Sequence, residues 1–421
     1  MRRFSQVQRR TNMTVHQPPA GARDLLPLDV TQKQWIERRL QDAFRRWGYH
    51  RIITSTLERL DTLMAGGAID RSTVMQFQDP DDETLGLRPE LTASIARAAV
   101  TRMAELSLPQ RLYYNANVFR RNCSKAYGGQ QEFYQAGVEL LGIDGAMADA
   151  EVLLLLGDCL RRVGLQRWTV VLGEAELTRS LLDPFPESYR SRVREAIARL
   201  DRVAVETMEL SPQLRDRALM LFDLRGRPKD VLQRLASLDL DDDRRRVLDN
   251  LKSLIALVES IDPELLESVV LDLSLIETFN YYTGIVFEVV CECESGTRLL
   301  GKGGRYDRLL ELYDPQQRRC PGIGFSLSLE DLQQTLLTGD RLPTNTPASD
   351  WLVVPSTPRA QAAAFSCARE LRQASELVRV ELLLEEFSDG DRVRQYARSR
   401  RISHLAWVTE HGDVQQETIE S

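Results

Sequence analysis

The sequence predicts an α/β (α+β) protein in which a core of helices and strands precedes a small βαβαβ domain. Three observations predict it. Strand and helix signals alternate through residues 49–172, and strand signals return at 269–293. Heptad-like Leu/Val/Ile spacing among charged residues indicates an all-helical insertion over about 187–268. A linker rich in Pro and Thr then precedes a final alternating segment. At about 100–200 residues per domain, 421 residues suggest two to four domains.

The chain begins with a polar segment, residues 1–15, that we expect to be a disordered tail. It contains two Arg-Arg pairs but no apolar stretch follows them, so a secretory signal is excluded. Whether translation starts at Met1 or Met13 stays open. The core is expected to span 16–340.

The first helix is expected over about 30–47, because Trp35, Ile36 and Leu40 begin a series of apolar residues at helical spacing. Asp29 with Gln32 resembles a capping box. The other elements expected in the core are a strand from Tyr49, mixed strands and helices over 84–142, an apolar helix over 149–163, and a strand over Trp168–Leu172.

The last part of the chain follows a linker expected at 341–350. Residues 351–421 read as strand, helix, strand, helix, strand, with parallel crossovers expected to be right-handed. The expected elements are Trp351–Val354, 358–373, Val378–Leu384, 389–400 and Leu405–Thr409.

Composition places the chain among ordinary globular proteins, with 43% hydrophobic and 28% charged residues. The net charge of −7 argues against a non-specific nucleic-acid binder, which needs a basic face. No run approaches the roughly 18 apolar residues of a membrane span. The six scattered cysteines suit free thiols in a reducing compartment, so we expect a cytoplasmic protein.

Cys291 and Cys293 form a C-x-C sequence that invites a zinc interpretation. They also lie in an alternating segment, where residues two apart share one strand face. Because no second cysteine pair accompanies them and the chain has 4 histidines, we expect no metal site.

Four short segments, far apart in the chain, carry the informative polar and glycine residues. Each alone is ordinary, since paired tyrosines are usually core residues and Gln and Glu often lie on exposed faces. The segments are Leu87–Thr92, Phe119-Arg120 with Phe133–Glu139, Tyr281–Glu288, and Gly303–Asp307 with Gly322–Phe325.

Together, in this order and spacing, these segments closely resemble histidyl-tRNA synthetase from about residue 17 to 335. The resemblance implies a class II aminoacyl-tRNA synthetase-like antiparallel sheet core with a helical insertion, a dimer, and a C-terminal anticodon-binding domain. The final domain stops soon after its third expected strand, so we expect an incomplete anticodon-binding-like domain.

The resemblance also implies a histidine pocket. Glu90 resembles the carboxylate that receives the ammonium group, and Gln135 resembles a polar partner of the amino-acid backbone. Glu139 and Tyr282 resemble the pair that reads the imidazole. Such a ligand needs acceptors for its ammonium and ring N–H and a donor for its carboxylate. The predicted histidine-binding residues are Glu90, Thr92, Arg120, Gln135, Glu139, Tyr281 and Tyr282.

Arginines that the family uses to activate the amino acid with ATP are replaced. Glu277 stands four residues before Tyr281, where one is expected, and Asp331 stands where the motif 3 arginine is expected. Reversing a unit charge at about 4 Å and an effective dielectric near 20 changes an interaction by roughly 8 kcal/mol. The arginines that follow the motif 2 loop are also absent. We therefore predict no catalytic residues and no cofactor.

A synthetase relative that keeps the pocket but loses these cations best resembles the regulatory subunits of ATP phosphoribosyltransferase. The resemblance implies a non-catalytic subunit that supports a short catalytic subunit in the first step of L-histidine biosynthesis and relays feedback inhibition by L-histidine. We expect no tRNA binding. Two alternatives remain: an active histidine–tRNA ligase, and a pure binding or scaffold protein. The stoichiometry and the place where histidine binds within the complex stay open.

Overall fold

The computed structural model describes residues 18–67, 69–121, 130–199, 201–238, 240–275, 281–293, 296–373, 376–385 and 389–420. The chain divides into two compact units, Met1–Leu342 and Pro343–Ser421. The expected tail and Glu277 lie outside the described residues.

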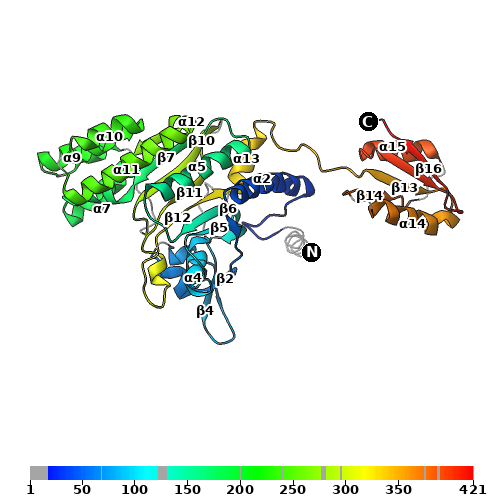
Figure 1. Ribbon diagram of the computed structural model, residues 1–421, viewed down its shortest axis with the longest axis horizontal. Coiled ribbons are helices and arrows are strands. Elements are labelled where there is room, and N and C mark those ends of the chain that lie inside the picture. Colours follow the sequence, from blue (N-terminus) through cyan, green and yellow to red (C-terminus); the bar gives the residue numbers. More distant parts are fainter. Residues whose placement is uncertain are drawn as a thin grey trace, which may run out of the picture. The chain divides into compact units, whose positions relative to one another are not determined.

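The first unit is built on a nine-stranded sheet with the order β1-β5-β6-β12-β11-β10-β7-β9-β8 (Figure 1). Its pairings are antiparallel except for β1 with β5 and β7 with β9, so the expected antiparallel core is a mixed sheet. The strands are β1 (His50–Arg51), β5 (Gln110–Phe119), β6 (Glu132–Leu141), β7 (Thr169–Glu174), β8 (Arg225–Gly226), β9 (Val269–Asp272), β10 (Ile285–Cys293), β11 (Gly296–Arg305) and β12 (Gly322–Ser328).

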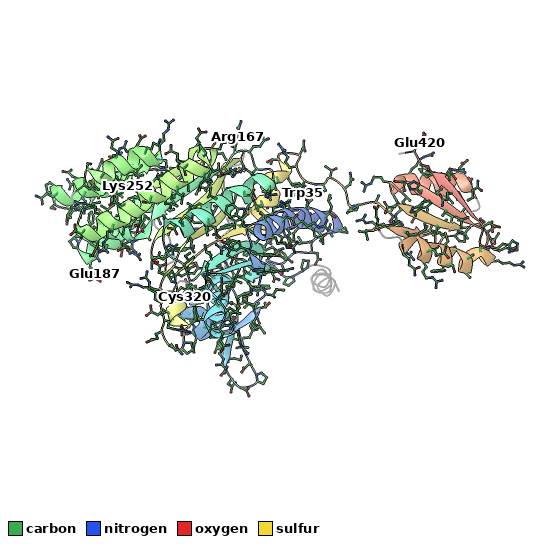
Figure 2. All side chains as sticks on the ribbon, viewed as in Figure 1. Trp35, Arg167, Glu187, Lys252, Cys320 and Glu420 are labelled. Carbon is green, nitrogen blue, oxygen red and sulfur yellow. The ribbon has the colours of Figure 1, made fainter. Side chains whose placement is uncertain are left out.

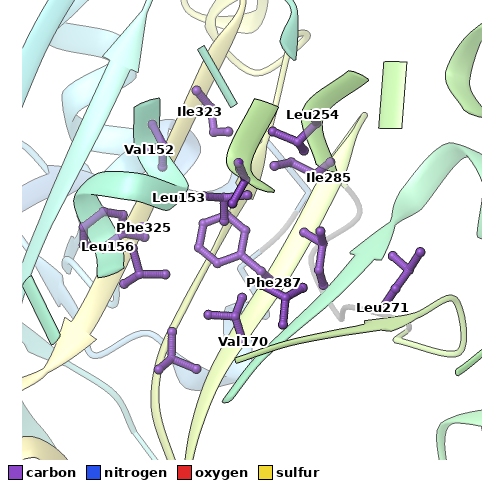
Figure 3. Close-up of a cluster of buried hydrophobic side chains, with 14 of the residues drawn as sticks. Val152, Leu153, Leu156, Val170, Leu254, Leu271, Ile285, Phe287, Ile323 and Phe325 are labelled. Carbon is purple, nitrogen blue, oxygen red and sulfur yellow. The ribbon is translucent and has the colours of Figure 1, made fainter. Parts of the chain in front are cut away.

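Helices cover one face of this sheet and enclose the main core. They are α2 (Pro27–Arg46), α5 (Ala146–Arg162), α11 (Asp242–Ile261) and α13 (Leu329–Leu337). Phe287 of β10 is fully buried among side chains from α5, α11 and the neighbouring strands (Figure 3). Burying such apolar surface is the main stabilising contribution to the fold.

The helix α2 begins three residues earlier than the sequence predicted. Pro27 occupies its first turn, where its missing N–H costs nothing. Asp29 is therefore the third helical residue, and its carboxylate accepts a hydrogen bond from the backbone N–H of Leu26 (3.0 Å). The predicted pairing of Asp29 with Gln32 is therefore wrong: the helix begins at Leu26 as N-cap, and Asp29 caps it from the first turn.

A second, small cluster covers the other face of the sheet. It contains the helix α4 (Thr92–Thr101) and a three-stranded sheet of order β2-β4-β3. The remaining elements here are β2 (Leu57–Arg59), α3 (Leu60–Met64), η2 (Arg71–Thr73), β3 (Gln76–Gln78), β4 (Thr84–Leu87) and η4 (Leu310–Leu312).

The segment expected to be an all-helical insertion is helical except for the two-residue strand β8. Sequence patterns missed β8 because two residues carry no periodicity; it pairs with β9 at the edge of the large sheet. The helix α6 (Ala175–Leu182) precedes this segment. The helices of the segment are α7 (Glu187–Ala198), α8 (Arg202–Thr207), α9 (Pro212–Asp223), α10 (Pro228–Ala236), α11 and α12 (Pro263–Glu267).

The second unit has a four-stranded sheet of order β14-β13-β15-β16. Its parallel strands and helices match the expected alternation, but the antiparallel strand β16 was not expected, because residues 414–418 are largely exposed and polar. The elements are β13 (Trp351–Pro355), η5 (Pro358–Ala360), α14 (Gln361–Arg372), β14 (Val380–Leu382), α15 (Gly390–Ser399), β15 (His404–Val408) and β16 (Val414–Thr418).

Charged side chains are frequent on the exposed side of α11, on which Lys252 lies (Figure 2). Among the described residues, no helix is both long enough and apolar enough to cross a membrane.

Candidate ligand-binding site

A pocket of about 270 Å³ lies on the face of the large sheet that α4 covers. All seven sequence-predicted binding residues line it, although they come from three of the four segments that the sequence singled out. The lining also includes residues that the sequence did not predict to bind histidine, chiefly Tyr114, Phe133, Tyr306, Ser326 and Ser328. Asp331 lines it as well.

The strand β12 makes room for this pocket by alternating large and small residues. Ile323, Phe325 and Leu327 belong to the main core on the helical face. Side chains alternate between the two faces of a strand, so Gly324 and Ser326 lie on the pocket face. Small side chains at these positions leave the floor of the pocket open.

Glu139 is the most buried acid of the pocket, with 2% of its surface exposed. It lies on β6, on the pocket face. Its carboxylate accepts hydrogen bonds from the Thr92 hydroxyl (2.8 Å) and from the Tyr306 hydroxyl. Burial raises the pKa of Glu139 to about 8; the two hydroxyl donors oppose this shift and the nearby Glu90 adds to it.

Glu90 holds the start of helix α4. Its two oxygens accept the backbone N–H groups of Thr92 (2.6 Å) and Ala93 (2.9 Å), which have no partners within the helix. Burial raises the pKa of Glu90, while these N–H groups and Arg120 oppose the rise. A carboxylate offers about four acceptor sites, so Glu90 can also receive a ligand ammonium group.

Thr92 links the two acids. Its backbone N–H donates to Glu90 and its hydroxyl donates to Glu139. The two carboxylates therefore keep a fixed separation that is set by one residue at the start of α4. The sequence placed Thr92 in the pocket without indicating this role.

Three tyrosines form the aromatic wall of the pocket. The rings of Tyr281 and Tyr282 lie 4.7 Å apart, and Tyr281 meets the edge of Tyr306 at 5.8 Å. Gly304 allows the ring of Tyr282 to pack here, since a Cβ at that position would lie 2.7 Å from Tyr282 Cε1. Tyr306 belongs to the segment Gly303–Asp307 noted in the sequence, but only the fold shows that it contacts Glu139.

Arg120 and Gln135 supply the other polar groups. Arg120 donates from Nε to the carbonyl of Pro89 (3.0 Å), and its guanidinium lies 6.0 Å from the ring centre of Phe133. Gln135 lies on β6, an even number of residues from Glu139, and both line the pocket. The pocket thus offers two carboxylates, a guanidinium, an amide and aromatic rings, a set suited to a small amino acid with a polar side chain.

Asp331 is not an isolated negative charge, and this corrects the magnitude expected from the sequence. Its carboxylate accepts from Arg298 (3.1 Å) and from the Ser328 hydroxyl (2.6 Å). The ion pair compensates the charge, so the roughly 8 kcal/mol of a bare reversal is too large here. The position still offers no cation to a phosphate.

Arg305, which ends strand β11 within the segment Gly303–Asp307, has a structural role. It is 4% exposed and pairs with Asp149 (2.6 Å) and Asp307 (3.1 Å). The Cys291 and Cys293 side chains lie along β10 and are free thiols. Among the described residues, no cluster of His, Cys, Asp and Glu could hold a metal ion.

Buried acids make stability depend on pH. Burial raises the pKa of Glu139 to about 8, of Glu174 to about 7 and of Asp149 to about 6. Each of these pKa values lies above the value in the unfolded chain, so the folded protein binds more protons and loses stability as pH rises through this range. For each such acid, a pKa difference of about one between the folded and unfolded chain changes stability by about 1.4 kcal/mol.

We therefore expect the unliganded protein to unfold at a lower temperature at pH 8 than at pH 5.5, as measured by calorimetry. The double variant Glu139→Gln/Glu174→Gln should show a flatter dependence. A midpoint that rises with pH over this interval would contradict the assignment.

Comparisons with known proteins agree on the family and the fold. A sequence model of the histidyl-tRNA synthetase family matches residues 21–332. A Trichormus variabilis protein called ATP phosphoribosyltransferase regulatory subunit is 60% identical over 400 residues, covering 95% of this chain and 98% of the relative.

Two solved structures share the fold. An ATP phosphoribosyltransferase regulatory subunit/histidyl-tRNA synthetase from Bacillus halodurans has a TM-score of 0.78 at 28% identity, covering 93% of this chain and 98% of that one. A histidyl-tRNA synthetase from Nostoc sp. has a TM-score of 0.75 at 18% identity, covering 95% and 96%.

Proposed function

Because this chain belongs to the family of ATP phosphoribosyltransferase regulatory subunits, within the wider histidyl-tRNA synthetase family, we propose that it assembles with a short catalytic subunit of that enzyme. In this assembly it performs no chemistry. It supports the activity of the catalytic subunit in the first step of L-histidine biosynthesis and relays feedback inhibition by L-histidine.

The single observation that carries the sensor role is the convergence of Glu90, Arg120 and Glu139 in one pocket. Free histidine carries an ammonium group, a carboxylate and an imidazole, and each finds a complementary group there. We assign the ammonium to Glu90, the carboxylate to Arg120 with Gln135, and the imidazole to Glu139 with Tyr282. Thr92 fixes the two acids, and Tyr281 supports Tyr282.

A sensor needs two states that bind histidine unequally, because a ligand shifts an equilibrium only by its difference in affinity. The chain supplies the histidine pocket, and the complex with the catalytic subunit supplies the active and inhibited states.

The alternative function is an active histidine–tRNA ligase, which the similarity to synthetases favours. Activation by ATP needs fixed cations beside the phosphates. At the motif 3 position this chain has Asp331 in place of an arginine. Asp331 forms an ion pair with the neighbouring Arg298. Histidine-dependent exchange of pyrophosphate into ATP by the purified protein would establish the ligase and contradict the proposal.

The decisive experiment mixes this protein with the catalytic subunit and measures product formation from ATP and phosphoribosyl pyrophosphate, with and without histidine. We expect activity only in the mixture and inhibition by histidine. No activation and no sensitivity to histidine would overturn the proposal and leave a scaffold role.

We also propose that the chain self-associates as a dimer through the small sheet. Leu57 and Phe77 are each 48% exposed, and cross-strand pairing to Leu87 and Leu85 puts them on one face. Exposed apolar patches of this kind mark interfaces.

Phe77→Asp is therefore expected to shift the protein from dimer to monomer in analytical ultracentrifugation, because it buries a charge in the interface. Phe365→Asp is the matched control, since Phe365 is 59% exposed on the second unit. A monomeric parent protein, or a dimer unaffected by Phe77→Asp, would contradict this interface.

A further inference from the structure

The pocket has an unbalanced charge when both of its acids are ionised. Glu90 and Glu139 each contribute a negative charge, and Arg120 contributes a positive one. The two other charged residues of the lining are paired outside the pocket: Asp331 with Arg298 (3.1 Å) and Lys302 with Glu288 (2.6 Å). The described lining therefore carries one uncompensated negative charge.

That charge belongs to Glu139. Glu90 lies at the N-terminus of α4, where backbone N–H groups stabilise an anion, and near Arg120. Glu139 has only neutral donors, the hydroxyls of Thr92 and Tyr306. The titratable groups that face it are Glu90 at the start of α4, Tyr114 on β5, Tyr281 and Tyr282 before β10, and Tyr306 after β11. Tyr49 also interacts with it electrostatically, and Arg120 lines the same pocket.

We propose that the pocket takes histidine together with one proton held between Glu139 and the imidazole, so that histidine sensing is proton-linked. This rests on the proposed function, because it assumes that histidine is the ligand. With that proton, each of the three charges of the pocket meets an opposite charge: ammonium, carboxylate and imidazolium. Without the proton, the buried Glu139 carboxylate faces a neutral imidazole. With two protons, Glu139 is neutral and the imidazolium has no anionic partner.

The proton count sets the pH dependence. The free imidazole is protonated below about pH 6.5. Burial raises the pKa of Glu139 in the empty pocket to about 8. Between these two pH values, Glu139 in the empty pocket is protonated and the free imidazole is neutral. The single proton is therefore already present before binding, and binding neither takes up nor releases one. Above about pH 8 binding must take up a proton, and below about pH 6.5 it must release one, so affinity falls by up to tenfold per pH unit on either side.

Titration calorimetry of the full chain with histidine, in buffer pairs of different ionisation enthalpy, measures the protons exchanged. The ligand ammonium also titrates at high pH, so Glu139→Gln is the reference, because it keeps the ammonium contribution and removes the acid. At pH 9 the parent protein should take up about one proton more than Glu139→Gln. Equal uptake by the two proteins would overturn the inference.

A second variant keeps the test decisive if Glu139→Gln binds too weakly. Tyr306→Phe removes a hydroxyl that lowers the pKa of Glu139. The pH at which proton uptake begins should therefore rise; an unchanged onset would overturn the inference. Glu174→Gln is the matched control, since Glu174 is also 2% exposed but does not line this pocket. Histidine binding without this proton exchange leaves the proposed function intact, whereas no histidine binding at any pH contradicts the proposed function itself.

Discussion

Replacing Glu139 with alanine is expected to weaken histidine binding by about 10- to 100-fold. A hydrogen bond to a charged group contributes about 1.5–3 kcal/mol, and each 1.4 kcal/mol is a tenfold change in affinity. Glu139 is the acid that we assign to the imidazole, so the substitution removes the acceptor for the ring N–H. Calorimetric titration with histidine checks the loss.

The fold is expected to survive this substitution. The carboxyl of Glu139 is raised in pKa by burial, which means that the folded state holds it at a cost. Tyr282→Ala should weaken binding in the same direction by removing one side of the aromatic wall. Circular dichroism and the unfolding midpoint provide the control. Unchanged affinity in both variants would mean that the pocket is inherited packing without a ligand.

Much of the fold was predictable because it depends on local patterns. The helix α11 buries apolar residues at helical spacing, such as Leu251, Leu254 and Val258, on one face. The helix α5 is apolar and buried along most of its length. Both patterns are visible in the sequence. Short or exposed elements were missed for the same reason. The strand β8 has two residues, and β16 is exposed and polar, so neither shows a hydrophobic period.

The residues of the site were predictable from the sequence, but the contacts between them were not. The identities of Glu90, Gln135 and Glu139 were recognisable from ordered segments, and the fold brings these segments to one pocket. Their partners were not recognisable. The bond from Tyr306 to Glu139 and the pair of Arg298 with Asp331 join residues more than thirty positions apart on different elements. Such contacts depend on strand register, which motif spacing does not encode.

Gly324→Ala is expected to disturb the fold and the pocket together. Gly324 on β12 lies opposite Glu139 on β6. A Cβ on Gly324 would lie less than 3.0 Å from Glu139 Oε2 and from the backbone oxygen of Val138. The Glu139 side chain can rotate away only by giving up its bonds to Thr92 and Tyr306, and the Val138 carbonyl can move only with its strand. Overpacking of this kind costs about 1–3 kcal/mol.

The expected result is a lower unfolding midpoint together with a loss of histidine affinity as large as that of Glu139→Ala. Gly339→Ala is the control, because a Cβ there meets its nearest atom at 3.6 Å. The comparison separates two explanations for a glycine at position 324. If Gly324→Ala lowers stability but keeps histidine affinity, the glycine serves strand packing alone. If both are lost, the glycine is required because the acid that reads the ligand occupies the space that a methyl group would fill.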